Sequence, residues 1–319
     1  MSVVTLPRLA RVAFAPLLIL YVACGLLWLV AGLAFPGFAA PGHLRYMLEQ
    51  SALLGIVAAG QTLVVITAGI DLSVGAMIAF AAIFGPSITQ AVGDNGFVSI
   101  VLLLTLASGV GAINGAAIAW LGIHPMILTL ASATILTGIM LLVSGGTAVA
   151  VQSPVVIWLA QGHLYGVSIS ILTWLAVAAA VTFLLRGTTL GLWLYAIGTS
   201  PRASELSGVN EKLALVTVYA VSGGLAGLTG VILSGVTMQG YIGIGDPYLL
   251  LSIAAVVVGG TSILGGHGGY GGTIAGAILL TTVTSLITVV NVSAGWRSVM
   301  LGLLVLGLLA LYAREGRRA

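Results

Sequence analysis

The chain has 319 residues, of which 60% are hydrophobic and only 5% are charged. A soluble domain carries about 25% charged residues, so this composition excludes a protein with a water-facing surface all round. The lipid bilayer is therefore the expected solvent. The net charge of +3 comes from basic residues scattered between apolar segments, and gives no indication of nucleic-acid binding. The single cysteine, Cys24, excludes an internal disulfide or a cysteine metal cluster.

The N-terminal segment is expected to be a retained membrane helix. Arg8 and Arg11 precede an apolar run from Val12 to Ala34. A cleaved signal peptide begins in a similar way, but its apolar core has only about 7–15 residues. The longer run fits the thickness of a bilayer.

The remaining apolar segments predict an all-α membrane protein. A spanning helix needs about 20 apolar residues. By that measure the ten expected spans lie at about 12–34, 46–68, 71–92, 97–121, 125–144, 168–185, 213–236, 249–264, 272–290 and 297–312. The loops are short, so we expect one transmembrane domain over residues 1–319 that depends on other chains for any soluble machinery.

The basic residues predict the orientation, because cytoplasmic loops are enriched in Lys and Arg. With the N-terminus inside and alternating spans, eight of the ten basic residues face the cytoplasm and only Arg45 and Arg297 face outward. The opposite orientation inverts this ratio. Both termini are therefore expected in the cytoplasm, as is segment 186–212, the most charged part of the chain.

The sequence lacks a motif for ATP hydrolysis. Its one lysine, Lys212, stands outside any Gly-x-x-x-x-Gly-Lys-Ser/Thr motif that would hold nucleotide phosphates. The segment from Gly266 to Gly271 fits Gly-x-Gly-x-x-Gly, but no acidic residue follows about 20 positions later, as a dinucleotide fold requires. A tight glycine turn between two helices is expected there instead.

The acidic residues argue for energy supplied by a partner. Proton-coupled transporters bury ionisable residues within their spans. In this chain the acidic residues fall at the ends of expected spans or in loops: Glu49, Asp71, Asp94, Glu205, Glu211, Asp246 and Glu315. This placement favours a cytoplasmic energy-supplying partner over a secondary transporter. No two acids, histidines or cysteines are placed to meet inside the bilayer, which argues against an embedded enzyme.

Three ordered segments carry a resemblance to a known family. They are Gly60–Gly75, Ala196–Gly198 followed by Leu206–Asn210, and Ala254–Ser262 running on to Gly265 and Gly266. In this order and at these separations they resemble the permease subunits of ribose-, xylose- and arabinose-type ABC importers. The resemblance covers nearly the whole chain.

The resemblance implies a function and a set of partners. The chain is expected to form an inner-membrane path for a small hydrophilic solute, a monosaccharide or related polyol. The implied partners are a second permease copy or paralogue, a cytoplasmic ABC ATPase and an extracytoplasmic solute-binding protein. ATP and magnesium would belong to the ATPase, leaving this chain without a cofactor. The implied fold is similar to the ten-helix vitamin B12-type importer permease. The alternative is a stand-alone channel or facilitator.

The resemblance also implies that segment 186–212 docks on the ATPase. A short helix is expected over about 201–208, because proline suits the first turn of a helix and glycine its end. The expected docking residues are Pro201, Arg202, Ser204, Glu205, Leu206, Ser207 and Gly208. The family commonly has acidic residues where this chain has Pro201 and Arg202, and a basic residue at Glu205, so we expect altered charges in the partner's groove.

Further roles are predicted for turns and for the translocation path. Gly69 is expected to end one helix and Asp71 to cap the next. Gln50 and Gln61 lie 11 residues apart, about three helical turns, and so share a face that should avoid lipid. The expected path residues are Gln50, Gln61, Asn114, Thr129 and Ser132, with polar contacts between helices as the alternative. The expected structural-turn residues are Gly69, Asp71, Gly75, Gly265 and Gly266.

Two outward loops, about 145–166 and 240–248, are expected to meet the binding protein. Tyr241, Asp246 and Tyr248 are the candidate contacts, and interfacial anchoring is the alternative for the tyrosines. Glycine pairs spaced by four predict close helix packing at 111 and 115, 223 and 227, and 272 and 276.

Overall fold

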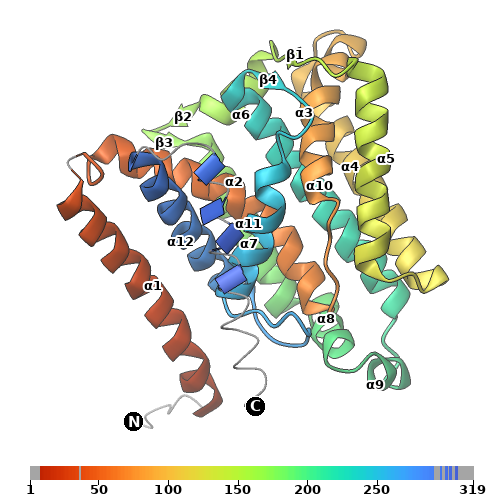
Figure 1. The fold of residues 1–319 in the computed structure, drawn as a ribbon. Coiled ribbons are helices and arrows are strands. Elements are labelled where there is room, and N and C mark those ends of the chain that lie inside the picture. The colour runs from red at the N-terminus through yellow and green to blue at the C-terminus, as the bar shows by residue number, and fades with distance from the viewer. Residues whose placement is uncertain are drawn as a thin grey trace.

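The computed structural model describes residues 8–35 and 37–290, together with 295–296, 299–300, 302–303 and 306–307. Long helices form one bundle (Figure 1). The helices are α1 (Arg8–Ala34), α2 (Pro41–Ile66), α3 (Val74–Ala91), α4 (Gly96–Leu121), α5 (Pro125–Ser144), α6 (Pro154–Gln161), α7 (Ile169–Gly187), α8 (Thr189–Thr199), α9 (Pro201–Leu206), α10 (Glu211–Thr237), α11 (Asp246–Val258) and α12 (Tyr270–Val289). The strands are β1 (Val149–Ala150), β2 (His163–Leu164), β3 (Val167–Ser168) and β4 (Gln239–Gly240). The all-α class is confirmed.

Within the described residues, seven helices are long and apolar enough to cross a membrane, namely α2, α3, α4, α5, α7, α10 and α12. They match seven of the ten expected spans. Helix α1 matches the first. The eighth differs: α11 has 13 residues, about 20 Å of helix, because Gly259 and Gly260 end it. The tenth, at 297–312, and the basic residues Arg297, Arg314, Arg317 and Arg318 fall largely or wholly outside the described residues.

Helix α2 lies at the centre of the bundle. Every residue from 51 to 67 is buried. Helices α7, α10, α11 and α12 pack around it. A helix that is apolar on all sides and enclosed by others satisfies its surface through packing alone. This position makes α2 the helix through which neighbouring elements contact one another.

Glycines allow the closest helix contacts. A β-carbon at Gly111 of α4 would overlap the carbonyl oxygen of Tyr219 on α10, and one at Gly223 of α10 would overlap that of Ala107. The pair at 272 and 276 likewise lies against the backbone of α11. All three predicted glycine pairs are therefore packing contacts, as small residues in membrane helices are expected to be.

Alanine at Gly111 is expected to destabilise the fold by about 1–3 kcal/mol, because the added carbon must push α4 and α10 apart. The matched control is Gly109→Ala on the same helix, where no heavy atom lies within 4 Å of the added carbon. That control should be neutral or gain about 0.5–1 kcal/mol from better helix propensity. Thermal unfolding of both purified variants in detergent measures the difference, and equal midpoints would contradict the packing role.

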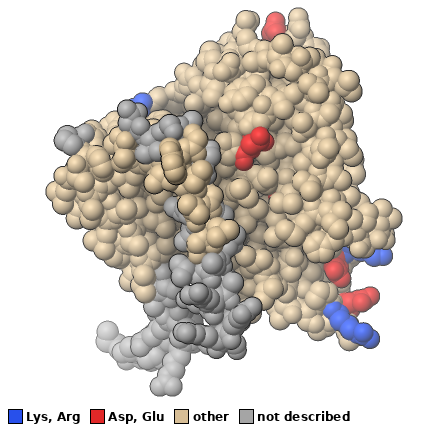
Figure 2. All heavy atoms as spheres, viewed as in Figure 1, with Lys and Arg blue, Asp and Glu red and all other residues tan. Residues whose placement is uncertain are grey.

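The two ends of the bundle differ. Helices α8 and α9 lie at one end, which we call the α9 end, and β1, β4 and α6 lie at the other, the β1 end (Figure 1). Figure 2 shows a face with few charged side chains, several of which gather at the α9 end. An uncharged belt between two polar ends fits a chain that crosses a bilayer.

Candidate functional site

A cavity of about 740 Å³ opens between α2, α11 and α12. Gln50 lines it from α2, and Asp246 and Tyr248 line it from the start of α11. Small-molecule sites are hollows of about 300–1,000 Å³ with a few placed polar groups. The cavity has the size and the polar groups to receive a small hydrophilic molecule.

Helix α12 presents a row of hydroxyl groups to this cavity. Thr281, Thr284, Ser285 and Thr288 all line it, and their spacing places them on one face of the helix. Thr284 Oγ1 donates to Thr281 O at 2.9 Å, and Thr288 Oγ1 donates to Thr284 O at 2.9 Å. Their oxygens therefore stay able to accept hydrogen bonds from a hydroxylated molecule.

The sequence analysis missed this row, although its spacing at i, i+3, i+4 and i+7 was a visible signal. Apolar residues fill the rest of the helix, so only the hydroxyl pattern distinguishes its cavity face.

Gln61 lies on the same face of α2 as the cavity, two helical turns beyond Leu54 of its lining. Its side chain is fully buried, and neither amide atom has a hydrogen-bond partner among the described residues. A buried amide without partners costs about 1–3 kcal/mol per lost bond. Gln61 is thus a polar group available to a molecule or water beyond the end of the cavity.

Asn114 and Thr129 have partners within the bundle. Asn114 Nδ2 donates to Ser73 Oγ at 3.4 Å. Thr129 Oγ1 accepts from Leu72 N at 3.0 Å and donates to Pro125 O at 2.8 Å. Both side chains are buried and hold the α2–α3 loop against α4 and α5. Ser132 is half-buried one turn further along α5.

Asp71 does not cap α3 as predicted, because α3 begins later, at Val74, with Ser73 at the N-cap position. Asp71 is nevertheless fully buried and bonded. Its Oδ1 accepts from Ser73 N at 2.9 Å and from Ser73 Oγ, and its Oδ2 accepts from Ser222 Oγ at 2.8 Å. The carboxylate therefore ties the α2–α3 loop to α10. A single-segment view of the sequence offers no sign of this distant partner.

Glycines allow close approach around this loop. A β-carbon at Gly69 would lie 2.6 Å from the hydroxyl oxygen of Tyr219, and one at Gly75 would lie 3.2 Å from Gly245 O. The loop between α11 and α12 has Gly265 and Gly266 at φ +82° and +73°. The Gly-x-Gly-x-x-Gly segment is thus a turn between two helices, as predicted.

Helix α9 lies exposed at its end of the bundle. Pro201 begins it, Ser200 Oγ accepts from Ala203 N at 3.3 Å as its N-cap, and Gly208 follows it at φ +78°. Leu206 is 85% exposed. Ser204 differs from the other predicted docking residues, because it is buried and donates to Pro201 O at 2.7 Å. The exposed set is Pro201, Arg202, Glu205, Leu206, Ser207 and Gly208.

A second hollow of about 670 Å³ lies beside α9. Glu205, Glu211 and Lys212 line it together with His124 of the α4–α5 turn. Charged groups of both signs and an exposed leucine thus gather at one place on an otherwise apolar chain.

The β1 end joins the two predicted outward loops. β1 pairs with β4 in an antiparallel ladder, which links segment 145–166 to segment 240–248. Tyr241 is 41% exposed there, and Asp246 is exposed at the start of α11. Tyr248 is half-buried and faces the cavity. The two loops therefore form one surface.

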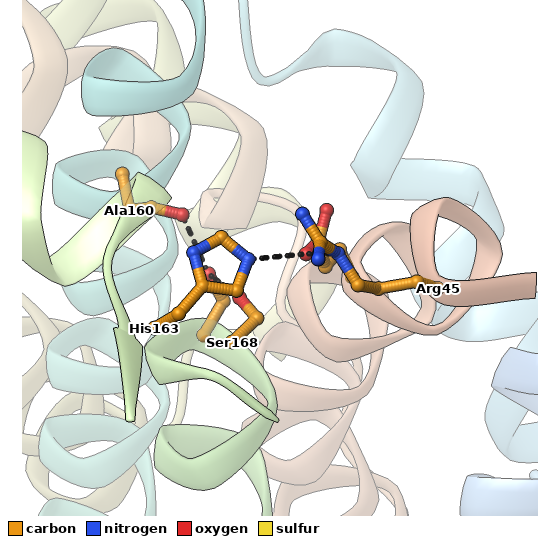
Figure 3. Close-up of polar contacts among 6 residues, drawn as sticks. Arg45, Ala160, His163 and Ser168 are labelled. Carbon is orange, nitrogen blue, oxygen red and sulfur yellow. Dashed lines mark hydrogen bonds and ion pairs between the residues drawn. The ribbon is translucent and has the colours of Figure 1, made fainter. Parts of the chain in front are cut away.

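A hairpin of β2 and β3 extends this surface. Its two-residue turn has positive φ at both Tyr165 and Gly166, as a type I′ hairpin requires. Tyr165 at the tip is 98% exposed. His163 Nε2 lies 3.9 Å from Glu49 Oε1 on α2, and Arg45 Nε lies 3.3 Å from the same oxygen (Figure 3). The sequence analysis missed Tyr165, although Tyr-Gly between two short polar-apolar pairs is a hairpin signal.

Together these features define a multi-pass membrane protein with a polar cavity among its spans and distinct surfaces at its two ends. A profile of the family described as branched-chain amino acid transport system / permease component matches residues 44–309. The chain belongs to this family, whose members are membrane permeases and not enzymes.

Its relatives transport sugars by name. The fructose import permease protein FruF of Bifidobacterium longum is 34% identical over 79% of this chain and 72% of its own. The ribose import permease protein RbsC of Haemophilus influenzae is 30% identical over 90% of each chain. The inner membrane ABC transporter permease protein YjfF of Escherichia coli is 33% identical over 87% of this chain and 85% of its own. These relatives confirm the resemblance to sugar importer permeases. No solved structure matches the chain.

Proposed function

We propose that the chain is the permease subunit of an ABC importer and forms the path for a monosaccharide or related polyol. The hydroxyl-lined cavity between α2, α11 and α12 is the observation that supports this most directly. Neutral hydroxyl and amide groups can exchange hydrogen bonds with a passing polyol without holding it as charged groups would hold an ion. The names of its relatives point to the same class of solute.

The path follows α2 and α12 in this proposal. Gln50 lines the cavity and Gln61 continues the same face inward. Asn114 and Thr129 serve the framework, because their polar groups are bonded within the bundle. Ser132 stays a prediction of path lining. A second permease copy or paralogue covers the cavity face and completes the path, in a fold of the vitamin B12-type.

The α9 end faces the cytoplasm and docks the ATPase. Arg186, Arg202 and Lys212 belong to this end, which accords with the enrichment of basic residues in cytoplasmic loops. An exposed leucine flanked by charged groups suits a site that a partner covers. Both termini are cytoplasmic in this arrangement, and ATP with magnesium is bound by the partner.

The β1 end receives the extracytoplasmic binding protein. Its joined loops offer Tyr241 and Asp246, and the hairpin adds Tyr165, a fully projecting aromatic side chain of the kind that anchors interfaces. A stand-alone facilitator is the alternative. It would leave the exposed α9 surface without a role in transport.

The deciding experiment reconstitutes the chain with the ATPase and binding protein encoded beside it. ATP hydrolysis is measured with and without solute-loaded binding protein. Stimulation by the loaded binding protein supports the proposal. Solute flux through the chain alone, with no ATPase association, would establish the facilitator.

Reversing the charge of Glu205 is expected to weaken association with the ATPase roughly tenfold, equivalent to about 1.4 kcal/mol of lost binding. The physical reason is that Glu205 is exposed beside Leu206 on the proposed docking face. Glu205→Gln should give a smaller loss than Glu205→Arg, because it removes the charge without reversing it. Co-purification titrated against ATPase concentration measures both. Unchanged binding of Glu205→Arg would exclude contact at this residue.

A further inference from the structure

Three connections between helices meet at the α9 end in direct backbone contact. Gly266 N donates to Ile66 O at 2.9 Å, which joins the α11–α12 loop to the last residue of α2. A β-carbon at Gly198, near the end of α8, would overlap both Ile66 O and Gly266 N. We call Gly198, Gly265 and Gly266 the glycine junction.

Further contacts hold the junction together. A β-carbon at Gly265 would lie 2.8 Å from Ala68 N and 3.0 Å from Gly198 Cα, so this loop also touches the α2–α3 connection. Tyr195 of α8 spans the junction, because its hydroxyl donates to Gly268 O at 2.9 Å. No side chain separates the backbones at these points. Such contact transmits displacement with little compression, because packed protein interiors are nearly incompressible.

The junction links the docking helix to the cavity. Ser200, which follows α8 directly, is the N-cap of α9, so a shift of α9 moves the end of α8. The helices that meet the junction from the other side are α2, α11 and α12, and these three line the cavity. The backbone contacts therefore run from the exposed docking helix to every helix of the cavity wall.

We propose that Gly198 is a positioning residue through which displacement of α9 is carried by backbone contact to α2, α11 and α12. Movement of α9 then shifts the three cavity helices together. The inference rests on the proposed docking of an ATPase at α9. It assigns to Gly198 a role in coupling hydrolysis to transport that is separate from docking, because Gly198 lies behind α9 and away from the exposed face of that helix.

The test uses the reconstituted complex with its ATPase and binding protein. Gly198→Ala is compared with wild type and with Gly138→Ala on α5, where the added carbon meets no heavy atom within 4 Å. ATPase co-purification and hydrolysis are expected to persist in Gly198→Ala. Solute taken up per ATP hydrolysed should fall roughly tenfold, within the range of coupling changes caused by residues between two sites. Gly138→Ala should match wild type in all three measurements.

Tyr195→Phe provides a second variant that removes one hydroxyl and adds no bulk. It should lower uptake per ATP roughly threefold while leaving co-purification unchanged. A purely structural role would lower the yield of complex without changing this ratio. A wild-type ratio in Gly198→Ala overturns the inference, and if that variant does not fold, a wild-type ratio in Tyr195→Phe overturns it. Failure of the wild-type chain to bind the ATPase contradicts the proposed function instead, together with the inference that rests on it.

Discussion

Replacing Asp71 by alanine is expected to lower the free energy of unfolding by about 3–5 kcal/mol, among the largest losses for a single substitution. The carboxylate is fully buried and accepts three hydrogen bonds from Ser73 and Ser222. Alanine leaves those donors buried without a partner, and each such group costs about 1–3 kcal/mol. The loop between α2 and α3 also loses its link to α10.

Asparagine at the same position separates the loss of the hydrogen bonds from the loss of bulk. Its oxygen can still accept from Ser73 while its amide group faces Ser222, whose hydroxyl can turn to accept. We expect Asp71→Asn to cost about 1–2 kcal/mol. Asp94→Asn is the matched control, because Asp94 is an exposed acid whose positive φ asparagine tolerates.

Thermal unfolding in detergent, followed by tryptophan fluorescence, ranks the variants. The expected order of midpoints is wild type and Asp94→Asn highest, Asp71→Asn lower and Asp71→Ala lowest. A midpoint for Asp71→Ala close to that of wild type would show that the buried carboxylate contributes nothing to holding the α2–α3 loop.

The locations of the spans were predictable because bilayer thickness imposes a length on every apolar run. The segment 125–144 matches α5 at both ends, since Pro125 and Gly145 mark its limits. The same reasoning overestimated α11, because the apolar residues continue past Val258 while two glycines turn the backbone away. Hydropathy measures the composition of a run and does not detect where a helix stops within it.

The polar residues show where a single sequence becomes insufficient. Gln50 and Gln61 were identified from their spacing on one helix, and that face is the one beside the cavity. Asn114 was identified in the same way, but its partner, Ser73, lies 41 positions away. Contacts of this range depend on how helices pack, which periodicity within one helix does not specify. The pairing of Asp71 with Ser222, 151 positions apart, has the same origin.

Leucine at Thr284 is expected to reduce solute uptake roughly tenfold, because loss of one hydrogen bond to a solute and desolvation of its hydroxyl together cost about 1.4 kcal/mol or more. Thr284 lines the cavity from α12, and its donated bond to Thr281 O leaves its oxygen free to accept from the solute. Leucine also narrows the cavity. The docking surface at α9 is distant from this change, so ATPase association should be unaffected.

Thr134→Leu supplies the matched control for this substitution. Thr134 is exposed on α5 and donates to Leu130 O at 3.0 Å in the same manner as Thr284 does within α12. Uptake of radiolabelled solute into proteoliposomes, normalised to complex content, measures both variants. We expect wild-type uptake with Thr134→Leu and reduced uptake with Thr284→Leu. Equal uptake by the two variants would remove the α12 hydroxyl row from the path and would move the search to the cavity beside α9, where Glu205 and Lys212 line the wall.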